Sequence, residues 1–168
     1  NRGLAKIKNT DYKSAVSDLD SAIKLKENYA EAYNNRGYAK YRSGDYRGGL
    51  ADCSRAIELD RNYYDAYYNR GDIKSDSGDY SGSVDDYNTA INLKPDNADA
   101  YNGRGYAKYR MARYNEAIAD YSIAIEKKKN FAKAYYNRGN AREDAGDYKG
   151  ALGDYKMVTR IEPRDIFA

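Results

Sequence analysis

The stretch AEAYNNRGYAKYRSGDYRGGLADCSRAIELDRNY occupies residues 30–63, and the fold of the chain follows from it. Two segments within it, 32–40 and 46–57, place their small and aromatic residues at helical spacing. The pair Gly44-Asp45 stands between them. A glycine can adopt the left-handed conformation that ends a helix, and an aspartate can cap the helix that follows. The stretch therefore predicts two helices joined by a tight turn.

The same unit recurs along the chain at a constant step of 34 residues. The triplet Asn-Arg-Gly marks most of its copies, and the last glycine of the triplet returns without a slip. These glycines are Gly3, Gly37, Gly71, Gly105 and Gly139. One hairpin cannot bury both of its faces, so neighbouring hairpins must stack into a continuous array.

These residues resemble the tetratricopeptide repeat (TPR) family, in the form that carries an Asn-Arg-Gly core triplet, over essentially the whole chain. The resemblance rests on small residues at Gly37, Gly49 and Ala56 and on aromatic residues at Tyr33 and Tyr46. It implies an all-α fold, a right-handed α-solenoid of five tandem helix-turn-helix hairpins. The related pentatricopeptide repeats, which read RNA, are disfavoured because the 34-residue step is uninterrupted.

We expect a single solenoid domain over residues 1–168. Its repeats are predicted at 1–29, 30–63, 64–97, 98–131 and 132–165, and residues 166–168 are expected to begin a further helix. The first repeat lacks the opening of its first helix. This pattern is typical of a piece of a longer solenoid.

The composition narrows the possible functions. The chain has 29 basic and 26 acidic residues, and such a mixed surface argues against a simple polyanion binder. It has no histidine and no metal-type cluster or phosphate-cradling glycine loop, so neither an enzyme nor a cofactor is expected. No apolar run approaches the roughly 18 residues that span a bilayer, so no membrane partner is expected. The lone Cys53 excludes an internal disulfide framework and leaves the compartment open, with the cytoplasm favoured.

An arginine and an aspartate recur in every repeat at packed positions. The arginines are Arg2, Arg36, Arg70, Arg104 and Arg138. The aspartates are Asp18, Asp52, Asp86, Asp120 and Asp154. We expect each arginine to lay its stem along the helix interface and to pair with an aspartate of its own or a neighbouring repeat. The alternative is that the arginines hold a carboxylate of a ligand.

The repeat pattern is broken at the turn of the fourth repeat and at Cys53. The fourth repeat has Ala112-Arg113 where its neighbours have Gly-Asp, which removes a helix cap worth about 1 kcal/mol. Cys53 occupies a column that holds leucine or tyrosine in the other repeats, and we expect it to be a small buried filler.

One side of each first helix carries the candidate binding residues. In the TPR family this side lines the concave groove, and tyrosines there are rigid, amphipathic and typical of binding hot spots. The resemblance therefore implies a protein-interaction scaffold that binds an extended peptide. Transferred repeat by repeat, the candidates are Asn35, Tyr38, Tyr41, Arg42, Tyr68, Asn69, Asp72, Asp76, Asn102, Tyr106, Tyr109, Arg110, Asn137 and Asn140.

An asparagine ladder runs along the same side, through Asn1, Asn35, Asn69 and Asn137, with a break at Gly103. An amide offers a donor and an acceptor together, so it can pair with a peptide unit whatever the sequence of the peptide. The ladder resembles the one by which the TPR region of O-GlcNAc transferase holds extended polypeptide. The alternative is that these amides bond neighbouring helices or water.

Two other functions stay open. Arg42 and Arg110, each after a tyrosine, could hold phosphates while the rings stack on bases, but Asp76 and Asp144 would repel a nucleic acid in alternate repeats. Exposed ends of a solenoid could instead stack head to tail into a homo-oligomer. The identity of a partner does not follow from the sequence.

Overall fold

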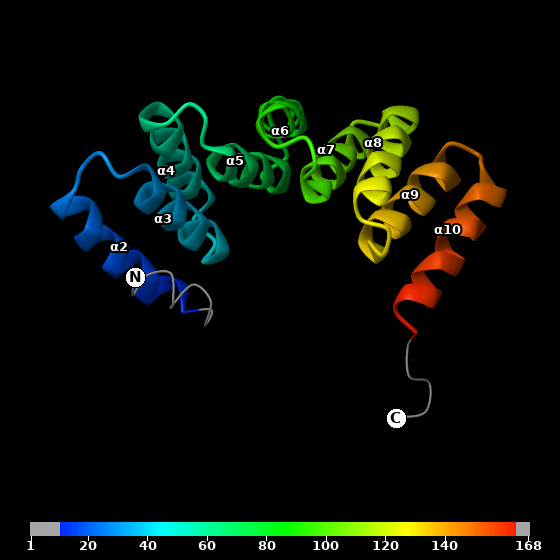
Figure 1. Cartoon of the computed structure of the whole chain (residues 1–168), viewed down its shortest axis with the longest axis horizontal. Coiled ribbons are helices and arrows are strands. Elements are labelled where there is room, and N and C mark those ends of the chain that lie inside the picture. The colour runs from blue at the N-terminus through cyan, green and yellow to red at the C-terminus, as the bar shows by residue number, and fades with distance from the viewer. Residues whose placement is uncertain (1–10, 164–168) are drawn as a thin grey trace. The chain divides into compact units, whose positions relative to one another are not determined.

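The computed structural model describes residues 11–163, whose course is shown in Figure 1. Helices and turns account for these residues, with no strand among them. The helices group into two compact units, Asn1–Leu93 and Lys94–Ala168. Several predicted features lie outside the described residues, namely Asn1, Arg2, Gly3 and the further helix over 166–168.

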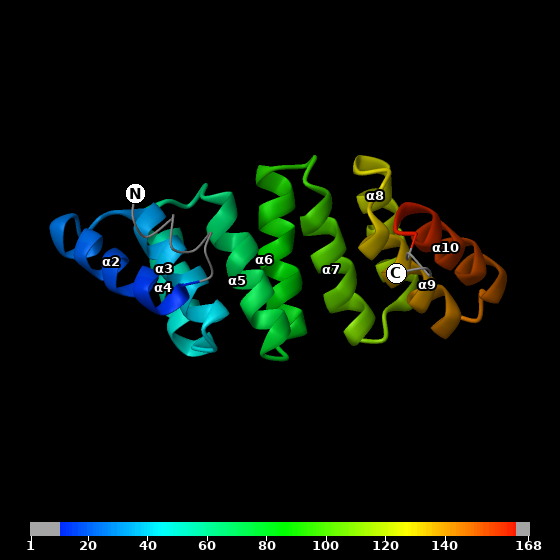
Figure 2. The same cartoon turned by 90° about the horizontal axis from the view of Figure 1, so that it is seen from below.

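The described part of the first unit is a series of helices that pack in chain order. These are α2 (Tyr12–Leu25), α3 (Ala30–Arg42), α4 (Tyr46–Leu59), α5 (Tyr64–Asp76) and α6 (Tyr80–Leu93). Each helix packs against the next, and α3 also contacts α5 (Figure 2). A first helix that touches its own partner and the next first helix is the arrangement expected of stacked hairpins.

The second unit repeats this arrangement in its described part. It holds α7 (Ala98–Arg110), α8 (Tyr114–Lys127), α9 (Ala132–Asp144) and α10 (Tyr148–Ile161). Each helix again packs against the next, and α7 also contacts α9. The first helices α3, α5, α7 and α9 begin at residues 30, 64, 98 and 132, one repeat length apart.

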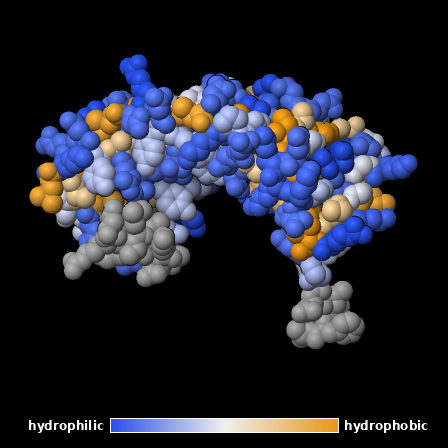
Figure 3. All heavy atoms as spheres, viewed as in Figure 1, coloured by the Kyte–Doolittle hydropathy of each residue, from blue (hydrophilic) through white to orange (hydrophobic). Residues whose placement is uncertain are grey.

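Small residues make up much of the core. Ala39, Ala66 and Ala107 are fully buried, and the fully buried Cys53 takes the place that the ring of Tyr87 fills in the next repeat. Burial raises the pKa of the Cys53 thiol to about 12, so Cys53 is an inert filler, as the sequence predicts. Polar side chains cover most of the surface of each unit seen in Figure 3. Within residues 11–163, no helix is long and apolar enough to cross a membrane.

The turns inside the hairpins share one backbone geometry. The fourth repeat keeps this geometry but has different residues in the turn. Gly44, Gly78 and Gly146 have φ values of 94°, 90° and 85°. Ala112 takes the same left-handed turn with φ of 57°, although it carries a side chain. Arg113, which follows it, makes no side-chain cap. The sequence-based expectation of a missing cap is therefore confirmed, and a strained alanine adds to it.

Restoring the Gly-Asp turn in the fourth repeat should raise the melting temperature. Ala112→Gly removes a left-handed strain of roughly 1–2 kcal/mol, and Arg113→Asp supplies a cap of about 1 kcal/mol. The second change loses the exposed ion pair between Arg113 and Glu116, at 2.5 Å, which offsets only a small part of these gains because solvent screens it. A net gain of at least about 1 kcal/mol corresponds to a rise of at least roughly 2–4 °C in a thermal melt followed by circular dichroism. An unchanged or lower melting temperature would contradict this reading of the turn.

Candidate functional site

A buried ion cluster in each described hairpin fixes the first helix against the second. In hairpin α3–α4, Nε and Nη2 of Arg36 donate to Oδ2 and Oδ1 of Asp52 at 2.8 and 2.6 Å. Lys40 Nζ lies 2.8 Å from the same Oδ2. The bond to Asp52 holds the pKa of Arg36 well above its usual range. The carboxylate of Asp52, only 5% exposed, is therefore held by two cations.

The same cluster recurs in the other described hairpins. Its members are Arg70, Lys74 and Asp86, then Arg104, Lys108 and Asp120, then Arg138, Arg142 and Asp154. The predicted arginine–aspartate pair is confirmed, with both partners in one hairpin, and Arg36 also pairs with Asp20 of the preceding repeat at 2.7 Å. The second cation, one helical turn after the arginine, was not predicted. These arginines are consequently occupied within the fold, which argues against the alternative that they hold a ligand.

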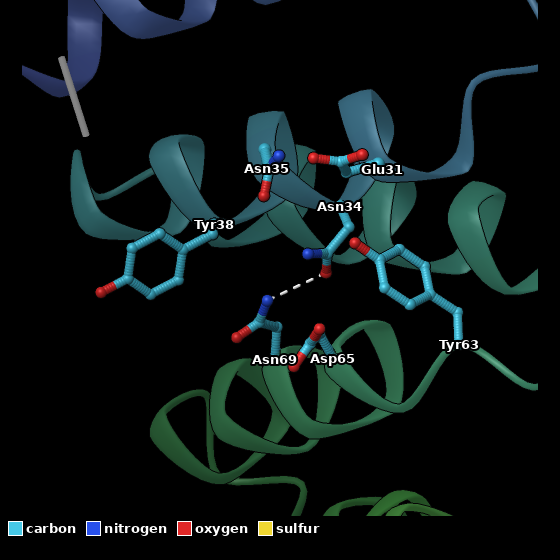
Figure 4. A pocket seen from close by; sticks show the side chains of 7 residues that line it. All are labelled: Glu31, Asn34, Asn35, Tyr38, Tyr63, Asp65 and Asn69. Atoms are coloured by element: carbon cyan, nitrogen blue, oxygen red, sulfur yellow. Dashed lines mark hydrogen bonds between the residues drawn. The ribbon is translucent and has the colours of Figure 1, made fainter. Parts of the chain in front are cut away.

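A groove of about 470 Å³ lies along the first helices α3 and α5 of the first unit. Figure 4 shows the side chains that line it: Glu31, Asn34, Asn35, Tyr38, Tyr63, Asp65 and Asn69. Tyr63 comes from the loop that enters α5, and the others come from the two helices. Amide, phenol and carboxylate groups therefore meet in one concave surface.

An amide pair joins the two helices inside the groove. Asn69 Nδ2 donates to Asn34 Oδ1 at 2.9 Å, drawn as the dashed line in Figure 4. Asn34 is only 4% exposed, so it acts as a fixed part of the wall. The Nδ2 of Asn69 therefore bonds a neighbouring helix, which is the alternative that the sequence left open for the asparagine ladder. Asn35, the next residue along α3, also lines the groove and is half-buried.

One end of the groove is acidic. Glu31 and Asp65 are exposed and lie at the same end as Tyr63 (Figure 4). Burial raises the pKa of the Tyr63 hydroxyl to about 12, and the negative charges of Asp65 and Glu31 act in the same direction. Among the ion pairs of residues 11–163, none involves either carboxylate. Glu31 accepts a hydrogen bond from the Tyr29 hydroxyl at 3.4 Å, and no cation of residues 11–163 neutralises the charge at this end.

Tyr38 lies at the other end of the groove, and Arg42 and neighbouring tyrosines support its ring from outside the groove lining. Arg42 Nη1 donates to the Tyr38 hydroxyl at 2.7 Å, and its guanidinium lies over the rings of Tyr12 and Tyr38. Tyr41 donates to Asp76 Oδ2 at 2.5 Å across to α5. Burial and this carboxylate together raise the pKa of Tyr41 above its usual range. Arg42 thus lies along ring faces, where it holds the Tyr38 ring in place.

Corresponding bonds occur in the second unit, two repeat lengths later. Asn137 Nδ2 donates to Asn102 Oδ1 at 3.0 Å. Tyr109 donates to Asp144 at 2.7 Å, which is the main reason that the pKa of Tyr109 is raised to about 12. Arg110 donates to the Tyr106 hydroxyl at 2.9 Å. The residues equivalent to Asn35, Tyr63 and Asp65, however, are Gly103, Phe131 and Lys133. The second unit thus keeps the hydrogen bonds between its first helices, but the side chains beside those bonds differ from those that line the groove.

The structure divides the predicted binding residues into two groups. Asn35, Tyr38 and Asn69 line the groove. The others take part in contacts within their own unit: Tyr68 stacks on Tyr64, Asp72 accepts from Tyr87, Asn140 accepts from Tyr155, and Tyr41, Arg42, Asp76, Asn102, Tyr106, Tyr109, Arg110 and Asn137 make the bonds given above.

Four groove residues are not in the predicted set. Glu31, Asn34 and Asp65 lie on the predicted face of the first helices but were not singled out. Tyr63 was missed because it precedes α5 and belongs to a loop in the sequence pattern. The signal that could have found it is the aromatic residue that recurs at this place, as Tyr29 and Phe131.

Metal binding gains no support from the described part of the chain. Within residues 11–163, no group of three or more cysteine, aspartate or glutamate side chains could hold a metal ion. The candidate site is therefore the groove, whose groups make hydrogen bonds, pack against apolar stems and attract cations.

Comparison with known families gives two matches. A sequence model described as TPR repeat matches residues 3–44, 71–111 and 113–146. A second, described as Tetratricopeptide repeat, matches residues 30–63. Among curated proteins, no sequence matches the chain significantly.

Several solved structures share the fold. A crystal structure of MamA is 24% identical, with a TM-score of 0.87, over 97% of this chain and 95% of that one. MamA from Desulfovibrio magneticus RS-1 is 19% identical, with a TM-score of 0.89, over 99% and 94%. YrrB, described as a TPR protein with an unusual peptide-binding site, is 18% identical, with a TM-score of 0.80, over 97% and 84%. These likenesses confirm the predicted all-α solenoid fold.

Proposed function

The chain belongs to the tetratricopeptide repeat family, and from this premise we propose that it is a protein-interaction scaffold whose α3–α5 groove holds an extended segment of a partner protein. The observation that carries the proposal is the meeting of amides and tyrosines in one groove between neighbouring first helices. The description of YrrB as peptide-binding supports it by analogy of fold. The role is that of a binding module without catalysis.

The groove offers groups suited to a peptide backbone. Asn35 presents a donor and an acceptor, which match the C=O and N–H of a peptide unit. Asn69 uses Nδ2 for Asn34, and its Oδ1 points away from that bond in Figure 4. Tyr38 and Tyr63 add rigid rings against which side chains of the segment can pack. We propose that the Asn-Arg-Gly triplet marks a branch of the family. Its arginine builds the ion cluster in hairpins α3–α4, α5–α6 and α9–α10, and Arg104 of the variant triplet Gly-Arg-Gly does so in α7–α8.

The alternatives gain less support. A nucleic acid would bring phosphates against Glu31 and Asp65, while Arg42 lies on the rings of Tyr12 and Tyr38. Head-to-tail assembly is the second candidate, because α10 exposes Leu152 to 55% and thus leaves an apolar side chain uncovered.

Removing groove side chains should weaken peptide binding. A phage-displayed library of random dodecapeptides is selected on the wild-type chain, and the enriched peptides are synthesised with a fluorescent label. We expect Asn35→Ala with Tyr38→Ala to weaken their binding at least about tenfold, because a tyrosine at a hot spot is typically worth more than 1 kcal/mol. Fluorescence anisotropy gives the dissociation constants.

The matched control is Tyr106→Ala. Tyr106 holds the place of Tyr38 in the second unit and accepts the same kind of bond from an arginine, at 2.9 Å. It should leave binding of these peptides within about twofold of the wild type, since surface changes away from a site have small effects. An equal loss in both variants, or a library without enriched peptides, would count against the groove.

A further inference from the structure

The acidic end of the groove contrasts with the other negative charges of the fold. Asp52 and Asp86 are buried, and each is already held by two cations within its hairpin. Glu31 and Asp65 are exposed, line the groove and form no ion pair with any residue between 11 and 163. The side chains that line the groove include no lysine or arginine. This end therefore has a negative potential that the described fold leaves uncompensated.

Resting on the proposed function, we infer that this end of the groove is a subsite for a lysine or arginine side chain of the bound segment. Glu31 projects from α3 and Asp65 from α5, on opposite sides of this end of the groove, with Tyr63 beside them (Figure 4). A cationic head group could donate a hydrogen bond to a carboxylate of either helix, and its aliphatic stem could pack along the Tyr63 ring. The protein partner is thus one that presents a basic residue within an extended segment.

The second unit supplies an internal contrast. Where the first unit has Asp65 and Tyr63, the second has Lys133 and Phe131. A lysine in that place would repel a cationic side chain. The subsite therefore belongs to the pair α3 and α5, and the corresponding place beside α7 and α9 selects differently.

A simpler role for these carboxylates is to stabilise helix ends. Glu31 and Asp65 lie in the first turns of α3 and α5, where acidic side chains interact favourably with the helix dipole. Asp99 holds the same place in α7 and lies outside the groove lining. Substitution of Asp99 therefore reproduces the effect on a helix end without touching the groove, which makes it the matched control.

The test uses the same library of random dodecapeptides on three proteins: the wild type, Glu31→Gln with Asp65→Asn, and Asp99→Asn. On the wild type we expect lysine or arginine to be enriched, and aspartate and glutamate depleted, at one position of the selected peptides. The synthesised peptides should bind the double variant about tenfold more weakly, and 0.5 M NaCl should weaken their binding to the wild type similarly, because the attraction between the carboxylates and the cationic side chain is lost or screened. Asp99→Asn should behave as the wild type.

The outcomes separate the two proposals. Peptides that are enriched and depend on Asn35 and Tyr38, but show no basic preference, overturn the cation subsite and leave the groove function standing. A loss of binding in Asp99→Asn equal to that in the double variant also overturns the subsite. A library that yields no binder overturns both proposals. Circular dichroism melts of all three proteins establish that the variants are folded.

Discussion

Replacing Asp86 by alanine will lower the free energy of unfolding by about 3 kcal/mol or more. Asp86 is 3% exposed and accepts from Nε and Nη2 of Arg70 at 2.9 and 2.6 Å. Lys74 Nζ lies 2.8 Å from the same carboxylate. Alanine leaves both cations, whose side chains are 21% and 22% exposed, without their anion, and the water that reaches them only partly replaces it. The cost therefore comes from the cations that remain more than from the bond that is lost.

The double variant Arg70→Leu with Asp86→Leu should be milder than Asp86→Ala. It removes one of the two cations together with the carboxylate, and apolar residues of similar volume often replace a buried ion pair at little cost. Lys74 loses Asp86 in both variants but keeps its bond to the Gly82 carbonyl oxygen, at 3.3 Å. The exposed pair Arg55–Glu58, at 2.8 Å, is the control, and Glu58→Ala should leave the midpoint of urea denaturation close to that of the wild type, because solvent screens the pair. Urea denaturation followed by circular dichroism measures all three. An Asp86→Ala protein as stable as the wild type would show that the cluster contributes no net stability.

Much of the fold could be predicted because it depends on spacing alone. The 34-residue step and the Gly-Asp junctions place the helices and turns, and the left-handed φ of Gly44 follows from its residue type. The turn at Ala112 shows the limit. A single alanine gives no local reason to adopt φ of 57°, and only the packing of the hairpin imposes it.

The site was harder to predict because some of its polar side chains form hydrogen bonds with neighbouring helices. The sequence places Asn69 and Tyr41 on the groove side, but both donate to the adjacent first helix, at 2.9 and 2.5 Å. Whether an amide meets a ligand or another amide depends on the distance between two helices, which no single repeat encodes. Tyr63 shows the opposite error, since a loop residue turned toward the groove carries no helical spacing to reveal it.

The tyrosines that open the second helices lie at different depths. The 34-residue step places them at Tyr12, Tyr46, Tyr80, Tyr114 and Tyr148, and this column predicts rings that wedge between hairpins. Tyr46 is 41% exposed and Tyr148 is 71% exposed, although the ring of Tyr46 does pack edge-on against Tyr41. A long amphipathic side chain can occupy the same repeat position in every hairpin while its tip reaches solvent. Periodicity therefore predicts the helix face on which a residue lies better than how far the residue is buried.

Gly37→Ala should destabilise the protein by about 2 kcal/mol. Overpacking costs up to about 3 kcal/mol, and the higher helix propensity of alanine returns roughly 1 kcal/mol of it. An added Cβ would lie 2.9 Å from Cys53 Sγ and 3.0 Å from the carbonyl oxygen of Gly49. Cys53 is fully buried and the carbonyl belongs to the backbone, so neither can move without separating α3 from α4.

Gly153→Ala should have the opposite sign. Gly153 is an exposed position of α10, and an added Cβ there would meet no atom within 4 Å. Only the gain in helix propensity remains, up to about 1 kcal/mol. Urea denaturation of both variants measures the difference, and a stabilised Gly37→Ala would contradict the close approach of the two helices. Adding Cys53→Ala to Gly37→Ala should recover part of the loss and not all of it, because removing Sγ leaves the Gly49 oxygen 3.0 Å from the new Cβ.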